Sequence, residues 1–317
     1  MNSAASWMGS SRIATAALVL SAAVVMCVGT VSAQISAGTV PAVVSIPLSV
    51  RSAGLNGAGA ALVGDAGAVF SNPASLATVR HVGLEGAYRS LPSSGNALNG
   101  AAAVRVRQFH LALSGAFLDY GTDATNFPIA GLPAGSDYRE RLAQGSLVYR
   151  FGTIALGGTV KYVRMNADTA EQRALGGDAG ITIAVFDIMA LAFSIQNLGG
   201  NWRSSSVLDL PRLSRFGFTM NFVDPQETWR LMSTIEVQWP EGRSTRFVGG
   251  IEAGVVVKGV GIIGRGAYGS RPQGTQASKF TVGASVLVME RLSFDYAYQP
   301  DDARGDKVHR LGLRLTL

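Results

Sequence analysis

Cysteine is almost missing from this sequence of 317 residues, and the single one, Cys27, lies in an N-terminal apolar stretch. A chain so poor in thiols has no disulfide scaffold and no cysteine metal site. It also has only three histidines and 15% charged residues, and its basic residues are scattered rather than clustered. We therefore expect no metal, no cofactor and no nucleic-acid partner.

Long hydrophobic runs are also scarce. One such run, residues 13–28, follows Arg12 and precedes the small residues Val31-Ser32-Ala33. About 16 apolar residues are few for a membrane-spanning helix, and the pattern is typical of a cleaved signal peptide. The sequence therefore predicts a signal peptide over 1–33 and an exported chain that begins at Gln34. An uncleaved N-terminal membrane anchor is the alternative.

Hydrophobic residues nevertheless make up 47% of the chain, so they must be distributed in another way. Beyond residue 78 they alternate with polar residues in segments of about ten, as in transmembrane β-strands. The last segment is an example, with leucine at 311, 313, 315 and 317 and polar residues at 310, 314 and 316. In lipid such strands must close into a barrel, because every backbone N–H and C=O needs a partner within the protein.

The alternating segments number about 14, an even count that keeps both ends of the barrel on the periplasmic side. Three of the segments are weak, those near 98–107, 138–151 and 260–269. Tight turns near 108, 152, 187, 224–227, 258–259 and 290–291 alternate with longer links at 90–97, 120–137, 166–173, 198–211, 240–244, 270–277 and 300–306. We expect an all-β, antiparallel, up-and-down transmembrane β-barrel over residues 79–317 in the outer membrane of a Gram-negative cell. A soluble β-sandwich or a β-solenoid is the alternative.

Residues 34–78 do not alternate and are rich in glycine and alanine, as a compact hatch packed inside the barrel would be. Gly64-Asp65 is expected to cap a short helix, and Asn72-Pro73 to begin a turn or helix. The candidate hatch residues, in a structural or gating role, are Gly57, Gly59, Asp65, Phe70, Asn72 and Pro73.

Charged residues with inward parity form a second set of candidates. They either pair across strands and hold the wall and the hatch together, or line a path for a solute; they are Lys161, Asp178, Glu236, Glu252, Arg265, Asp295, Arg310 and Arg314. The link 120–137 carries the apolar candidates Phe127, Ile129 and Leu132, which fit a solute site or a partner surface. No serine, histidine and acidic residue are marked as a catalytic group, so we do not expect an enzyme.

Several segments resemble one family of outer-membrane barrels. They are 54–59, 64–66 and 70–76 in the predicted hatch and 193–199 and 294–300 in the predicted barrel. Their order and spacing are similar to those of the PorV/PorQ-like branch of the FadL superfamily, across essentially the whole exported chain. The paired acids of the family pattern appear here as Gly64-Asp65. The resemblance implies a 14-stranded barrel with an N-terminal hatch inside.

The resemblance implies two functions. PorV-like barrels serve type IX secretion, so the first expectation is a secretion-associated scaffold or cargo-shuttle barrel. The alternative is a FadL-like passive transporter of small hydrophobic solutes, which leave sideways through a wall opening near the hatch. Expected partners are outer-membrane lipid, the barrel assembly machinery during insertion, and either secretion-system proteins or a hydrophobic solute.

Overall fold

The structure is a computed structural model. It describes residues 40–91, 95–120, 138–167, 170–185, 188–199, 208, 210–223, 228–271, 278–300 and 307–317. The predicted signal peptide and the loop candidates Phe127, Ile129 and Leu132 lie outside these residues. Within the described residues no helix is long and apolar enough to cross a membrane.

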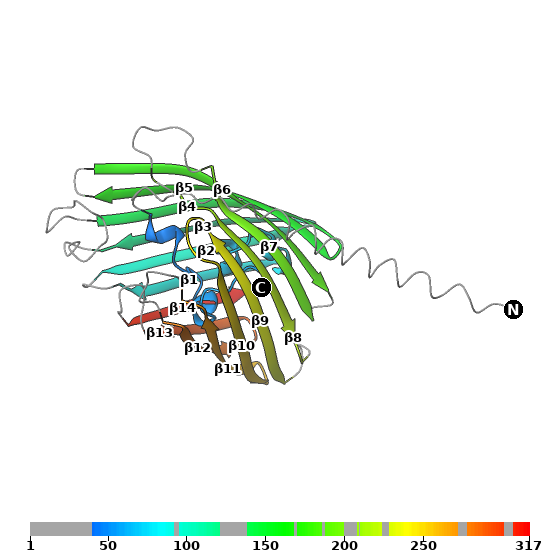
Figure 1. Cartoon of the computed structure of the whole chain (residues 1–317). Coiled ribbons are helices and arrows are strands. Elements are labelled where there is room, and N and C mark those ends of the chain that lie inside the picture. The colour runs from blue at the N-terminus through cyan, green and yellow to red at the C-terminus, as the bar shows by residue number, and fades with distance from the viewer. Residues whose placement is uncertain are drawn as a thin grey trace. The chain divides into compact units, whose positions relative to one another are not determined.

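Fourteen antiparallel strands form a closed barrel, in which each strand pairs with its neighbours in sequence and β14 pairs with β1 (Figure 1). This confirms the predicted fold class and strand number, including the three segments with weak alternation. The strands are β1 (Val82–Ser90), β2 (Asn96–Val106), β3 (Phe109–Asp119), β4 (Tyr138–Phe151), β5 (Ile154–Ala167), β6 (Ala170–Val185), β7 (Met189–Leu198), β8 (Leu213–Asn221), β9 (Trp229–Pro240), β10 (Arg246–Val257), β11 (Val260–Gly269), β12 (Phe280–Val288), β13 (Leu292–Gln299) and β14 (Val308–Thr316).

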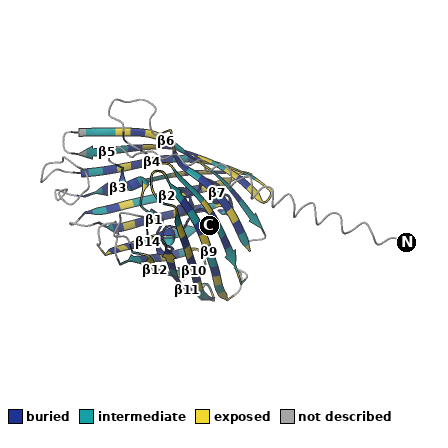
Figure 2. Ribbon diagram, viewed as in Figure 1, coloured by how far each residue is buried: buried dark blue, intermediate teal, exposed yellow. Residues whose placement is uncertain are grey.

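Burial alternates along the strands, because successive side chains point to opposite faces of a sheet. In β1, Glu85 and Arg89 are buried inside the barrel, whereas Leu84 and Tyr88 are exposed on its outer face. Figure 2 shows the same banding on neighbouring strands. Large apolar side chains exposed on the outer face of strand after strand are the surface that a barrel presents to lipid.

The predicted link at 166–173 is wrong. Strand β5 continues to Ala167 and β6 begins at Ala170, with paired residues throughout. The apolar alternation stops here because the outward positions carry Arg164, Glu171 and Arg173, although the backbone pairing continues. The β5–β6 hairpin is therefore longer than its hydrophobic pattern.

Four short helices form the hatch: η1 (Ala42–Val44), α2 (Val50–Gly54), η2 (Ala66–Phe70) and η3 (Pro73–Thr78). Residues from 40 to 79 form hydrogen bonds with inward-facing side chains of strands around the ring, including Glu140 on β4, Thr182 on β6, Glu236 on β9 and Arg314 on β14. They therefore lie inside the barrel, where the blue turns are seen in Figure 1.

The expected helix after Gly64-Asp65 is a 3₁₀ helix, and Asp65 does not cap it through its side chain. The carboxylate turns instead toward two arginines. At the expected helix start at Asn72-Pro73, the Asn72 side chain accepts a hydrogen bond from the Ala74 N–H and Pro73 takes the first position of η3.

Candidate functional site: the hatch and the barrel interior

The hatch carries two charged residues, Arg51 and Asp65, and both lie in one ionic cluster with the wall. Arg51 binds Glu252 of β10 through two nitrogens, Nε at 2.9 Å and Nη2 at 2.7 Å, and reaches Asp65 Oδ2 with Nη1 at 3.0 Å. Asp65 also accepts a hydrogen bond from Arg314 of β14 at 2.9 Å. The hatch is thus fastened to two separate parts of the wall by charge-assisted hydrogen bonds.

These ion pairs keep Arg51 charged. Burial by itself would lower the pKa of Arg51, but the charges of Glu252 and Asp65 and their hydrogen bonds raise it above its ordinary value. At neutral pH the buried guanidinium is therefore charged and bound to two carboxylates.

The cluster continues along β11 to β14. Arg265 lies 3.0 Å from Glu252 and 3.7 Å from Asp295, and Arg314 lies 3.4 Å from Asp295. Ser285 is hydrogen-bonded to both Arg265 and Asp295. Four predicted lumen candidates, Glu252, Arg265, Asp295 and Arg314, are therefore brought together with the hatch. Whether any of them lines a solute path stays a prediction.

Glu236 of β9 holds the glycine-rich part of the hatch. Its Oε2 accepts the backbone N–H groups of Gly59 and Ala60, both at 2.7 Å, and its Oε1 is 3.1 Å from Arg215 of β8. Gly57 has a φ of +82°, a conformation that favours glycine, and its carbonyl accepts from Arg215. At Gly59 a Cβ would collide with Ser71. Both glycines are thus required by close packing or backbone conformation.

Asn72 is fully buried at the contact between η3 and β6. Its Nδ2 donates to the Ala60 carbonyl at 2.9 Å and to Thr182 Oγ1 at 3.0 Å. The carbonyl of Phe70, before it in the chain, accepts from Gln196 of β7 at 2.9 Å. On this side of the barrel Gln196 of β7 therefore satisfies a backbone carbonyl of the hatch, and Thr182 of β6 binds the Asn72 side chain.

Lys161 and Asp178 form a buried ion pair at 2.7 Å between β5 and β6. The pairing of β6 with β7 shifts register between Gly177 and Ala179, and Asn197 of β7 fills the irregularity with a φ of +64°. Its side chain accepts from Lys161 at 2.9 Å and its N–H donates to Asp178 at 2.8 Å. These two lumen candidates hold a β-bulge together and touch no described hatch residue through a hydrogen bond.

Arg310, the remaining lumen candidate, is buried on the inner face of β14 beside Arg89 of β1. It lies toward the end of the barrel that carries the longer connections. The structure therefore does not place Arg310 in the ionic cluster with Arg314.

An inner apolar cluster lies toward the same end of the barrel as Arg310, the end with the longer connections. The N-terminal segment, residues 41–48, contributes Val43 and Leu48 to it, and Ile46 packs against it. The wall contributes side chains of β2 to β6 and neighbouring residues: Leu91, Ala97, Ala116, Leu118, Tyr120, Tyr138, Leu142, Val163, Met165, Ala174, Leu208 and Leu210. The barrel interior is thus apolar here and ionic around α2.

Glu140 of β4 fixes the N-terminal segment in this cluster. The carboxylate is almost completely buried and accepts the N–H groups of Ala42 at 3.0 Å and Val43 at 2.7 Å. The Tyr138 hydroxyl donates to the same carboxylate at 2.7 Å. The segment is therefore held by two charge-assisted hydrogen bonds and by apolar packing.

The sequence pattern did not single out Arg51, Glu140 or Arg215. A signal for Arg51 was present, since it and Asp65 are the two charges of the stretch 34–78. Glu140 lies in a weakly alternating segment and has arginines on both sides, which hid its inward parity. No group of three or more histidine, cysteine or acidic side chains in the described ranges is arranged to hold a metal ion.

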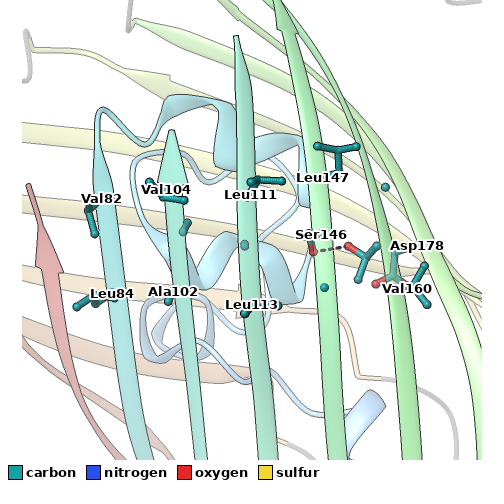
Figure 3. Close-up of a pocket in the computed structure, with 15 residues that line it drawn as sticks. Val82, Leu84, Ala102, Val104, Leu111, Leu113, Ser146, Leu147, Val160 and Asp178 are labelled. Carbon is teal, nitrogen blue, oxygen red and sulfur yellow. Dashed lines mark hydrogen bonds between the residues drawn. The ribbon is translucent and has the colours of Figure 1, made fainter. Parts of the chain in front are cut away.

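The outer face of the wall carries a groove of about 970 Å³ that is lined by residues of β1 to β6 (Figure 3). Its border is formed by outward-facing apolar side chains, among them Leu84, Leu111, Leu113, Leu147 and Val160. The strand ladders from β1 to β6 are continuous under the groove, so no wall opening is present in this described region.

No protein-family model matches the sequence, and a comparison with curated proteins likewise finds no match. Solved structures do match. A FadL homologue of Pseudomonas aeruginosa is 14% identical with a TM-score of 0.57, and the match covers 88% of this chain and all of that one. The CymD monoaromatic hydrocarbon channel is 10% identical with a TM-score of 0.56, covering 86% of this chain and 97% of that one.

A deltaS2S3 mutant of the TodX monoaromatic hydrocarbon channel is 10% identical with a TM-score of 0.54, covering 84% of this chain and 97% of that one. At such identities the likeness concerns the fold. It agrees with the predicted FadL-superfamily barrel and gives no support to the narrower PorV/PorQ-like assignment. The chain therefore has the fold of FadL-type hydrocarbon channels.

Proposed function

We propose that the protein is a passive transporter of small hydrophobic solutes across the outer membrane. The observation that carries this proposal is the inner apolar cluster, in which an N-terminal segment occupies the space between apolar side chains of β2 to β6. Ligand sites are concave and lined mainly by apolar side chains with a few polar groups that fix orientation. The fold shared with hydrocarbon channels supports the same assignment.

The N-terminal segment closes the path in the described conformation. Its apolar side chains take the contacts that a hydrophobic solute would make, so a solute enters only when the segment moves. Movement breaks the two hydrogen bonds to Glu140, and their strength therefore sets how often the site opens.

The experiment is uptake of naphthalene by Gram-negative cells that express the chain. Wild-type protein should raise the uptake rate above that of cells with an empty vector. Glu140→Gln leaves two backbone donors facing one acceptor oxygen, which costs about 1–3 kcal/mol for the unpaired group. The variant should therefore open more often and take up naphthalene faster than wild type.

Glu241→Gln is the matched control. Glu241 follows β9 on the exposed rim, where it pairs with Arg212 at 3.1 Å, and it has no hydrogen bond to the N-terminal segment among the described residues. Its uptake should equal that of wild type. Uptake by wild type no faster than with the empty vector would reject the transport proposal.

The secretion-associated scaffold stays a prediction from the sequence resemblance. The comparisons favour the transporter over it. Unchanged uptake after deletion of the gene, together with loss of surface proteins, would favour the scaffold instead.

A further inference from the structure

Three arginines lie side by side on the outer face of the barrel, toward the end with the longer connections. Arg141 on β4 pairs in register with Arg164 on β5, and Arg164 pairs with Arg173 on β6. All three have outward parity, and Arg141 and Arg173 are exposed. Like charges directly opposite each other on one sheet face are destabilising unless an anion lies among them.

Carboxylates of the chain itself supply part of the negative charge that the arginines need. Glu171 accepts hydrogen bonds from both Arg164 and Arg173, and Asp119 pairs with a fourth arginine, Arg139, at 3.3 Å. Among the described residues of this rim four arginines thus face two carboxylates, an excess of two positive charges within that set. Arg141 stacks over the Phe117 ring at 5.5 Å and forms no ion pair with another described residue.

The depth of the arginine row in the membrane follows from the free-energy cost of placing an arginine against lipid. An arginine on the lipid-facing side costs about 2–4 kcal/mol at mid-bilayer and about 0–1 kcal/mol near the interface. The next outward row toward the barrel centre is Ala143, Tyr162 and Leu175, and tyrosine suits the interface. The arginine row therefore lies at the level of the lipid headgroups, on the external side if the short turns are periplasmic.

The outer groove begins below these residues on β4 and β5 and extends across β3 and β2 to β1. Two successive outward rows line it, Ala102–Leu113–Gly145–Val160 and Val104–Leu111–Leu147–Gly158, each paired in register. The small residues Ala102, Gly145 and Gly158 leave the space that the larger neighbours border. Gly145 is four residues from Arg141, which is about 13 Å along the strand.

We propose that this face binds a phosphate-bearing membrane lipid, with the phosphate on Arg141, Arg164 and Arg173 and an acyl chain in the outer groove. Guanidinium groups bind phosphate oxygens in pairs of parallel hydrogen bonds, and the excess of positive charge matches the phosphate. A free anion would use the arginine row but leave the groove empty. The lipid accounts for both features because a headgroup and a chain are joined at this spacing.

The experiment measures lipid binding to the purified full chain in neutral detergent by native mass spectrometry. The probes are dimyristoyl phosphatidic acid, dimyristoyl phosphatidylcholine with the same chains, and inorganic phosphate. Phosphatidic acid should bind at least ten times more tightly than phosphatidylcholine. The triple variant R141Q/R164Q/R173Q should lose at least tenfold in affinity for phosphatidic acid, since charge-assisted hydrogen bonds to the phosphate are removed.

A matched control removes three exposed arginines at the opposite end of the barrel, as R105Q/R107Q/R291Q, and should change the affinity less than twofold. The groove is tested separately by G145L/G158L. A Cβ at Gly145 or Gly158 meets no atom closer than 3.7 Å, so both substitutions fit on the outer face. This variant should weaken phosphatidic acid binding while every arginine is retained.

Equal binding of phosphatidic acid to the triple variant, its control and wild type would overturn the proposal. So would inorganic phosphate that binds as tightly as phosphatidic acid together with an unaffected G145L/G158L variant, because the site would then be one for a free anion.

Discussion

Removing the guanidinium of Arg51 should loosen the hatch without unfolding the barrel. Arg51→Met keeps the length of the side chain and deletes its bonds to Glu252, Asp65 and the Val63 carbonyl. Removing one partner of a buried ion pair costs about 3–5 kcal/mol, chiefly because the other charge is left alone. Here Glu252 keeps Arg265 and Asp65 keeps Arg314, so we expect the lower end, about 3 kcal/mol.

A change of about 3 kcal/mol is roughly a hundredfold in an equilibrium constant. Hydrogen exchange measures this directly, because local opening of the hatch exposes its amides. In Arg51→Met the protection of amides between residues 50 and 79 should fall roughly a hundredfold, with the strand amides unchanged. Arg212→Met, which breaks the exposed pair with Glu241, should leave hatch protection as in wild type.

Two results would refute this reasoning. If hatch protection in Arg51→Met equals that of wild type, the ionic cluster does not hold the hatch. If protection falls equally in the hatch and in the strands, the hatch and barrel open together and the cluster stabilises the whole fold.

Three further changes have defined outcomes. Asn72→Ala removes the hydrogen bonds to the Ala60 carbonyl and the Thr182 hydroxyl, both buried, and should lower the free energy of hatch opening by about 1–3 kcal/mol, measured by hydrogen exchange. Unchanged exchange would show that water replaces the Asn72 amide. Gly157→Ala should displace η3, because its Cβ would lie 2.6 Å from the Ala74 nitrogen, and should raise conductance in planar bilayers; the neighbouring Gly158→Ala, on the outer face, should not. Lys161→Met removes the ion-pair partner of Asp178 and should lower the free energy of unfolding of the barrel by about 3 kcal/mol, measured in guanidinium chloride. An unchanged unfolding midpoint would show that the Asp178 carboxylate is neutralised in another way.

The barrel could be predicted from the sequence because its signal is local. Alternation with period two decides which side chains face lipid, and a closed ring follows from the need to pair every backbone group. The signal failed at the β5–β6 hairpin, where charged outward residues such as Arg164 and Arg173 replace apolar ones while pairing continues. The extent of that hairpin depends on backbone pairing, which the hydrophobic pattern does not record.

The contacts of the hatch could not be predicted in the same way. Arg51 and Glu252 are 201 residues apart, and their meeting depends on where a short helix sits inside a closed ring. Inward parity did identify Glu252, Asp295 and Arg314 as candidates, but parity gives the face of a strand and not its partner. Residues 41–48 lie within the predicted hatch, but their contact with Glu140 was missed because they have no pattern of their own.

The most direct test of the transport proposal is to locate a solute inside the barrel. Crystals of the protein soaked with bromobenzene should give an anomalous bromine peak within the inner apolar cluster, between Leu118, Leu142 and Val163, with the N-terminal segment displaced. Bromine peaks confined to the outer wall, with residues 41–48 still bound to Glu140, would contradict the proposed path.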